Sequence, residues 1–326
     1  MPGESITLKT VSASSAGLHR KFKRQYILKV ETNFQSGADK YVQIAYPITV
    51  EFTISRHNCA AANTAQFVIY NLAPSTRSLI YKDLTDLDSK YLRAIQFYAG
   101  YADAPGDLLP QCLNGTIKQA YSQRSGSDFK TTIEAYDGMP STGIYQVSRT
   151  IPAGTPQAEA IATLANDAGV KGKMTISQKF DTISKRAASF MGSPLDQLSQ
   201  ASNGGFYIDS GNAYALDVTD IIPGDIQEIS EDNGLLGTPK KGQAYIDIEM
   251  LFEPRLKPSQ LINLVSATEP RFNGTYKVTG IVHRGTISGA TCGDCRTTVT
   301  MLFMRGYSIV YDRATQQYTV NSPEGA

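Results

Sequence analysis

Several segments of this chain place an apolar side chain at every second position. In the longest of them, residues 244–252, the even-numbered positions are all apolar and mostly polar residues separate them. Successive side chains of a β-strand point to opposite faces of a sheet, so this spacing predicts a strand with one buried and one exposed face. Strands of this kind are typical of antiparallel sheets that pack on one side only.

Further strands are expected wherever this period or a short apolar run recurs. The segments are 48–54, 66–70, 93–101, 115–121, 129–136, 206–208, 214–216, 261–265, 274–283 and 297–303. Turn-forming residues at Ser125–Asp128 and Asp209–Asn212 predict hairpins between the strands that they separate.

Three short helices are expected to begin at hydroxyl residues, which can accept hydrogen bonds from free backbone N–H groups. The first follows Ser75 and ends near Asp86. The second begins at Thr155 and the third at Ser193, and each has proline next, where no N–H group is needed. Gly169 supplies the left-handed residue that ends the second helix.

We therefore predict a mainly β fold with an α+β insert, in which two small β-barrel domains flank an α+β domain. The predicted boundaries are 1–25 for an N-terminal arm, 26–139 for the first barrel, 140–222 for the α+β domain, 223–312 for the second barrel and 313–326 for a polar C-terminal tail.

The two β domains share a short repeated element. Asn114–Lys118 is Asn-Gly-Thr-Ile-Lys, and Asn273–Lys277 is Asn-Gly-Thr-Tyr-Lys. Each copy is followed by a Ser-Gly turn and then by Thr-Thr-Ile at 131–133 or Thr-Thr-Val at 297–299. Asn-Gly opens a strand well because both residues tolerate the positive φ of a tight turn. Two such turns can arise by chance, but the matching downstream order favours duplication of one domain.

The composition limits the classes of partner. Lysine and arginine number 31 and aspartate and glutamate 30, so the chain lacks the basic excess typical of sequence-independent binding to duplex DNA. No run of about 18 apolar residues is present, and the N-terminus lacks the basic-then-apolar pattern of a secretion signal. We expect synthesis and assembly in a cytoplasm, without membrane insertion.

Cys292 and Cys295 have the spacing of a metal-binding or redox pair. A structural zinc site needs two more ligands, which His283, or Cys59 with His57, would have to supply. No second pair of this spacing exists, and no βαβ pattern surrounds the first. We interpret the two as loop cysteines, reduced or joined locally, and expect no metal and no cofactor.

Catalytic chemistry has little support in the sequence. Two acidic groups, Asp83 with Asp86 and Asp88, and Glu228 with Glu231 and Asp232, lie in polar, loop-like segments that are typical of a solvated surface. No nucleophile elbow, phosphate-binding loop or His-Glu-x-x-His motif is present, so we expect no catalytic residue. Lys240 and Lys241 could meet DNA in a channel, but such charges more often lie on a solvated face or bind a neighbouring subunit.

A series of motifs in one order carries a family resemblance. The motifs are 67–77, 95–101 leading to 114–117, 133–138, 151–156, and 273–278 with 283–285. Together they resemble hub proteins of bacteriophage tail baseplates over most of residues 45–303. This chain is shorter than the longest hubs, and its cysteine pair is not a feature of the family.

The resemblance implies an architecture and partners. Such hubs form a trimeric ring in which two tail-tube-type barrels per chain give pseudo-sixfold symmetry. The ring joins the hexameric tail tube to the trimeric central spike, and phage DNA passes through its lumen. The implied partners are two further copies, the tube protein, the spike protein and other baseplate or tape-measure proteins. The implied location is the virion tail, after assembly in the host cytoplasm.

Two other functions remain open from the sequence. A cell-wall-degrading tail enzyme would need an acid/base constellation, which the chain does not display. A carbohydrate-binding tail adhesin is compatible with β domains that contain many of the 18 tyrosines.

Overall fold

The computed structural model describes residues 6–8, 21, 23–33, 40–59, 61–83, 92–102, 109–137, 147–170, 172–222, 227–291, 293–304, 308–312 and 317–321. Most of the predicted N-terminal arm lies outside these residues.

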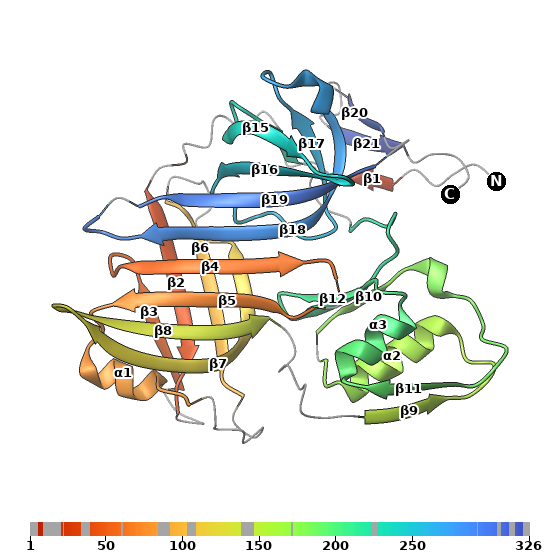
Figure 1. Cartoon of the computed structure of the whole chain (residues 1–326), viewed down its shortest axis with the longest axis horizontal. Coiled ribbons are helices and arrows are strands. Elements are labelled where there is room, and N and C mark those ends of the chain that lie inside the picture. The colour runs from red at the N-terminus through yellow and green to blue at the C-terminus, as the bar shows by residue number, and fades with distance from the viewer. Residues whose placement is uncertain are drawn as a thin grey trace.

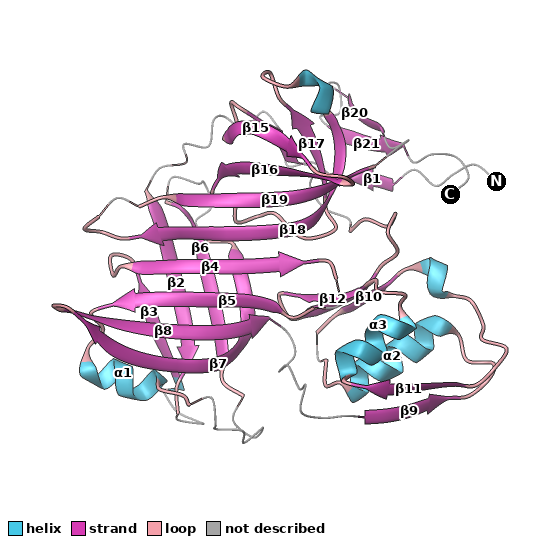
Figure 2. Cartoon of the chain, in the orientation of Figure 1, coloured by secondary structure: helices cyan, strands magenta, loops and turns pink. Residues whose placement is uncertain are grey.

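Strands dominate the described chain, and its helices and 3-10 turns are short (Figure 2). The strands are β1 (Ile6–Leu8), β2 (Arg24–Glu31), β3 (Tyr41–Ala45), β4 (Val50–His57), β5 (Asn63–Tyr70), β6 (Ala94–Tyr101), β7 (Gln111–Ser125), β8 (Asp128–Asp137), β9 (Val147–Ile151), β10 (Met174–Ile176), β11 (Ala188–Gly192), β12 (Phe206–Asp209), β13 (Asn212–Ala215), β14 (Gln227–Ser230), β15 (Leu235–Lys241), β16 (Tyr245–Leu251), β17 (Leu261–Val265), β18 (Gly274–Ile287), β19 (Cys295–Phe303), β20 (Ser308–Asp312) and β21 (Gln317–Asn321). The helices are α1 (Pro74–Ile80), α2 (Gln157–Asp167) and α3 (Pro194–Ala201), with 3-10 turns η3 (Gln178–Phe180) and η4 (Pro270–Phe272).

Within the described residues, thirteen strands form one continuous sheet (Figure 1). Its order is β15-β16-β19-β18-β4-β5-β8-β7-β6-β2-β3, and β14 joins through β17 to β18. The long alternating segment forms β16, which buries Ile246, Ile248 and Met250 as predicted. The expected fold class, mainly β with an α+β insert, is confirmed.

The sheet packs on two hydrophobic cores. In the first, Phe97 lies between Phe52 and Phe67, with ring centroids 5.1 and 4.9 Å away. The second is built from β15 to β19 and the residues around them. The first core also contains Ile287 and Cys295, which lie at the far end of the β18–β19 hairpin. This hairpin therefore contributes to both cores.

The insert lies to one side of the sheet (Figure 1). Helices α2 and α3 pack around a core that includes Ile161, Leu164, Leu198 and Phe206. Around the helices are a three-stranded sheet, β10-β13-β12, and the β9–β11 ribbon. The predicted hairpin at 209–212 is confirmed as the turn between β12 and β13.

The helix starts were predicted with mixed success. Ser193 caps α3 as expected, and its hydroxyl accepts a hydrogen bond from the backbone N–H of Asp196. Ser75 does not cap α1, because that helix already begins at Pro74, and it ends at Ile80 rather than near residue 86. Thr155 does not cap α2, which begins two residues later. In both cases proline sets the local φ without needing a side-chain cap.

Twelve of the thirteen strands of the large sheet, all except β3, fall into two sets of the same order. The set β4-β5-β8-β7-β6-β2 corresponds to β15-β16-β19-β18-β17-β14, and the chain forms both sets in the same sequential order. The two sets differ in the direction of their last strand pair. Strand β2 is antiparallel to β6, whereas β14 is parallel to β17. We call these sets the first and second repeat.

The β7–β8 and β18–β19 hairpins share a β-bulge. A register shift leaves Lys118 in β7 and Thr279 in β18 without an opposite residue. In each hairpin, the last residue of the Thr-Thr-Ile or Thr-Thr-Val segment, Ile133 or Val299, lies opposite the residue two positions after the bulge. The two hairpins can therefore be aligned residue by residue.

This alignment does not superimpose the Asn-Gly elements. Gly274 opens β18 as predicted, but Gly115 lies inside β7, which begins at Gln111. The expectation that Asn114-Gly115 forms a strand-opening turn is wrong. Gly115 lies opposite Asp137 in extended backbone, and the neighbouring strand passes too close for a larger side chain.

The ends of the chain pair with each other. Strand β21 lies between β1 and β20 in a separate small sheet. Residues 317–321, which we expected to belong to a polar tail, form the strand β21. The alternation of Tyr318 and Val320 with polar neighbours is the strand signal that the overall polarity of this segment hides.

Replacement of Gly115 by alanine tests the close approach of the strands. A Cβ atom there would overlap the carbonyl oxygen of Tyr136, and backbone must move to relieve the contact. We expect Gly115→Ala to lower the free energy of unfolding by about 2 to 3 kcal/mol in urea denaturation. The control is Gly242→Ala, where the nearest atom is 3.4 Å from the added carbon. Equal stability of the two variants would contradict this account.

Candidate assembly site at the sheet junction

The two repeats meet edge to edge at β4 and β18. The strands pair antiparallel over eight residue pairs, from Gly280 opposite His57 to Ile287 opposite Val50. Strand β18 is long enough to pair with β17 in its first half and with β4 in its second half. The backbone hydrogen bonds of the first repeat therefore continue into the second without a free edge between them.

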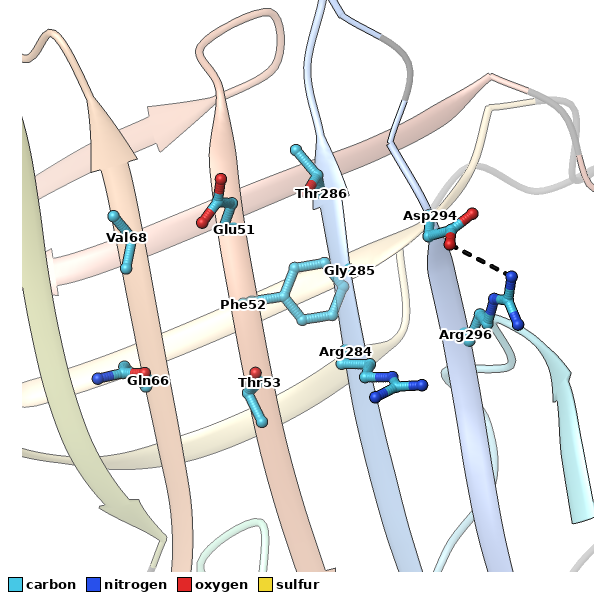
Figure 3. A pocket seen from close by; sticks show the side chains of 10 residues that line it. All are labelled: Glu51, Phe52, Thr53, Gln66, Val68, Arg284, Gly285, Thr286, Asp294 and Arg296. Atoms are coloured by element: carbon cyan, nitrogen blue, oxygen red, sulfur yellow. Dashed lines mark hydrogen bonds and ion pairs between the residues drawn. The ribbon is translucent and has the colours of Figure 1, made fainter. Parts of the chain in front are cut away.

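The sheet face opposite the cores is polar across this junction. Figure 3 shows Glu51, Thr53, Gln66, Arg284 and Arg296 around an open hollow over β5, β4, β18 and β19. These side chains alternate along their strands with the buried core residues. The hollow has no enclosed apolar floor of the kind that small-molecule sites use.

The arginines of this face are paired with carboxylates. Arg296 lies 3.0 Å from Glu249 and 3.2 Å from Asp294. Arg284 lies 3.5 Å from the same oxygen of Glu249. One glutamate therefore compensates two guanidinium groups, and the salt bridges cross three neighbouring strands.

The lysines of the same face are also compensated. Lys118 lies 3.4 Å from Glu134 on the neighbouring strand. Lys130 lies over the ring of Tyr70, 5.2 Å from its centroid, and the hydroxyl of Tyr70 donates to Glu51 at 2.7 Å. These four cations therefore each lie beside a carboxylate or an aromatic ring, so this part of the face presents mixed charge.

A buried arginine connects the junction to the insert. Arg56, near the end of β4, donates from Nε and Nη2 to the two carboxylate oxygens of Asp209, both at 2.7 Å. Its third donor, Nη1, reaches the carbonyl oxygen of Leu256 at 3.0 Å. Arg56 is 1% exposed, so this bidentate pair joins the first repeat, the insert and the second repeat in a dry environment.

The β12–β13 turn is bound by the ends of two further strands. Asp137, at the end of β8, accepts hydrogen bonds from the backbone N–H groups of Ser210 at 2.6 Å and Gly211 at 3.1 Å. Asn63, at the start of β5, donates to the carbonyl oxygen of Ile208 at 2.8 Å. Burial, together with the nearby carboxylate of Asp209, raises the pKa of Asp137 to about 7.

Among the predicted metal-site candidates that the structure describes, no metal-binding group is formed. Cys292 lies outside the described residues, Cys295 is buried and Cys59 is exposed. Burial lowers the pKa of His283 to about 3, and its Nδ1 atom is 2.9 Å from the hydroxyl of Thr297. In the part of the chain that the structure describes, no group of three His, Cys, Asp or Glu residues could hold a metal ion.

The acidic groups do not form an acid/base pair in a described cleft. Asp86 and Asp88 lie outside the described residues. Glu231 accepts hydrogen bonds from the N–H groups of Ala267 and Thr268, at 3.0 and 3.3 Å, which lower its pKa to about 2. This glutamate therefore stabilises a loop. None of the helices in the described ranges is long and apolar enough to span a membrane.

Sequence reasoning missed the residues that fix the insert. Arg56 follows Phe52 and Ile54 at the spacing of inward-facing residues, which was a signal for a buried charge. Asp209 was recognised only as a turn residue, and Asp137 only as part of the motif at 133–138, close to a predicted domain boundary. No pattern in the sequence indicated that Arg56, Asp209 and Asp137 lie close together.

Solved structures of tail proteins have this fold. A tail protein from Neisseria meningitidis MC58 is similar with a TM-score of 0.58 at 9% identity, covering 85% of this chain and 96% of that one. The 43 kDa tail protein of prophage MuSo2 from Shewanella oneidensis gives 0.58 at 8% identity, covering 91% and 99%.

A third similar structure comes from a secretion apparatus. The E. coli c3393 protein is a component of the type VI secretion system with structural similarity to the T4 bacteriophage tail proteins gp27 and gp5. It gives a TM-score of 0.54 at 12% identity, covering 85% of this chain and 76% of that one. At these identities the likeness concerns the fold alone.

The family is shown by the sequence itself. The family model described as baseplate hub gp41 matches residues 27–284, and the chain belongs to this family. It is therefore a structural protein of a phage tail, located in the baseplate of the virion. A search of the curated proteins found no match to this sequence.

The buried carboxyl group of Asp137 predicts an unusual dependence of stability on pH. The pKa of Asp137 rises from 3.8 to about 7 on folding, so the folded chain binds the additional proton between these values. The resulting stabilisation is full below about pH 4 and is lost as pH rises through about 7. We expect Asp137→Asn to remove a slope of up to about 1.4 kcal/mol per pH unit in this window.

The measurement is urea denaturation of both proteins from pH 4.5 to 8. Asp128→Asn, in the same strand at its exposed end, is the control and should keep the wild-type slope. An unchanged slope in Asp137→Asn would show that this carboxyl is ionised throughout.

Proposed function

We propose that three copies of this chain form a ring that connects the hexameric tail tube to the trimeric central spike. The observation that supports this most is the pair of repeats with one strand order, joined edge to edge through β4 and β18. Each repeat would form one tube-type barrel, within 26–139 and 223–312, with the α+β domain of 140–222 between them.

The symmetry follows from the duplication. Three chains with two similar repeats each present six similar units around one axis, although the exact symmetry is only threefold. A head-to-tail contact closes into a ring when its rotation matches that symmetry. Such a ring can offer six similar sites to a tube and three identical sites to a spike.

The polar sheet face is suited to the wall of the channel. In the proposed ring it faces inward and the two cores face outward, so phage DNA passes over side chains such as Thr53, Gln66 and Arg284. Paired charges would limit adhesion of the DNA, because sequence-independent binding depends on free cations that neutralise phosphates. Other baseplate and tape-measure proteins would be further partners, and assembly would take place in the host cytoplasm.

The ring makes a direct prediction about mass. We expect the purified full-length protein, alone or with its spike partner, to sediment as three copies of the 35.4 kDa chain. Sedimentation velocity over a range of concentrations measures this. A protein that remains monomeric when the spike protein is present would contradict the proposal.

The compensated face predicts the effect of removing one carboxylate. Glu249→Gln leaves Arg284 and Arg296 without their shared partner. We expect affinity of the assembled ring for duplex DNA to rise several-fold, with a salt dependence steeper by about 0.9 for each phosphate newly neutralised.

The control for this variant is Glu269→Gln. It removes the partner of Arg271 in η4, away from the sheet face, and should leave DNA binding unchanged. DNA binding can be followed by fluorescence anisotropy in a salt series. Equal affinity of the Glu249→Gln ring and the wild-type ring would contradict the assignment of this face to the channel.

A further inference from the structure

A tight turn ends the insert and leads the chain toward the second repeat. It comprises residues 217–220, in which the backbone N–H of Asp220 donates to the carbonyl oxygen of Asp217 at 3.1 Å. Lys179, in η3 of the insert, donates to a carboxylate oxygen of Asp217 at 2.9 Å. We call this turn the strap, and its ion pair with Lys179 ties it to the insert.

Lys277 holds the strap from the side of the second repeat. Its Nζ atom donates to the carbonyl oxygens of Asp217 at 3.2 Å and Val218 at 2.9 Å. In β18 it lies between Tyr276 and Val278, which belong to the second core, so its side chain leaves the opposite face of the sheet. Lys277 is nevertheless only 2% exposed, because the strap lies over it.

The ammonium group of Lys277 is poorly compensated for a buried charge. The residues opposite it on the neighbouring strands, Leu261 and Leu302, are apolar. The carboxylates that act on it are those of Asp220 and Asp217, and the insert lysine already pairs with the latter. Burial lowers the pKa of Lys277 to about 8, although both carboxylates act in the opposite direction. Closing the strap over the protonated lysine therefore costs free energy.

The two attachments of the insert differ in kind. The β12–β13 turn is held by the bidentate contact of Arg56 with Asp209, both of which are buried. The strap buries little side-chain surface, because Val218 is 66% exposed and the carboxylate of Asp217 is half exposed. Segments with little apolar burial are those that open most readily in a folded protein.

We propose that the strap opens and closes over Lys277, and that the buried ammonium group favours the open state. In the open state the β12–β13 turn stays bound to Arg56, and the rest of the insert tilts about it, away from β18. The chain beyond the strap stays in place, where the N–H of Ile222 donates to the carbonyl oxygen of Ser259 at 3.0 Å. The inference goes beyond the proposed ring and does not depend on it, because every contact lies within one chain.

The sign of the pH dependence follows from the two states of the lysine. Its pKa is lowered from the ordinary 10.5 to about 8 when the strap is closed. Below about pH 8 Lys277 is protonated in both states, and closing carries the full cost of burying the charge. Between these two values the open state binds more protons, so the closed-to-open ratio rises with pH by up to about tenfold per unit.

Hydrogen exchange of the full-length protein measures strap opening without any substitution. Peptides that cover residues 217–222 are followed by mass spectrometry from pH 7.5 to 9.5, above the range in which Asp137 titrates. After correction for the intrinsic exchange rate, we expect their protection to rise roughly 20-fold, while β16 shows no such rise. Protection of the strap that stays constant or falls over this range would overturn the proposal.

The variant Lys277→Met removes the charge and keeps an unbranched side chain. We expect its strap to be several-fold more protected than that of wild type at pH 7.5, with no further rise up to pH 9.5. The matched control is Lys240→Met, an exposed lysine on β15, which should keep the wild-type protection and pH dependence. A less protected strap in Lys277→Met would show that the ammonium group closes the strap, and would overturn the proposal.

Spin labels test the tilt of the insert. Asn166→Cys on α2 and Lys241→Cys on β15 place labels at exposed positions, in a chain in which Cys59 and Cys292 are replaced by serine. Double electron–electron resonance should give two distances, with the second more populated at pH 7.5 than at 9.5. Lys277→Met should give one distance throughout. A single distance in the otherwise wild-type chain at every pH would overturn the tilt.

Discussion

The structure depends on backbone pairing between two strands that are more than two hundred residues apart. Strands β4 and β18 join two repeats that each have their own hydrophobic core, and the pairing makes them one sheet. Because the hairpin of β18 and β19 places Ile287 and Cys295 in the first core, the repeats also share side-chain packing. The relative orientation of the two repeats is thereby fixed by both backbone and side-chain contacts.

The insert is attached by a different kind of interaction. Arg56, Asp209 and Asp137 form a buried polar group at the ends of the strands, with two carboxylates close to one guanidinium. A buried ion pair often contributes little net stability, because desolvation of the charges offsets their attraction. Its geometric effect is clearer here: the bidentate contact accepts one orientation of the β12–β13 turn. This polar group therefore fixes where the insert sits beside the sheet.

The sequence predicted the features that depend on local side-chain order. Alternation of buried residues identified β16, and turn residues identified the β7–β8 and β12–β13 hairpins, because burial period and turn conformation are both local. The repeat was recognised through Asn114-Gly115, yet the structural equivalence lies in the bulge at Lys118 and Thr279.

The features that escaped prediction depend on contacts between distant segments. Strands β4 and β18 pair through backbone atoms that every residue possesses. The side chains of the two strands therefore do not indicate that they are neighbours. Arg56 and Asp209 are 153 residues apart, and neither is unusual in its own segment. The polar segment of β21 is a strand because β1 and β20 supply its partners. The strand pairing, the Arg56–Asp209 ion pair and strand β21 could each be identified only from the folded structure.

The proposed ring connects these observations with the baseplate hub family. Electron micrographs of the purified full-length chain, averaged along the particle axis, test it most directly. The account predicts closed rings of three copies, in which a continuous inner wall has six similar units and the inserts lie outside it. Particles with open chains of subunits, or rings with the inserts lining the channel, would contradict it.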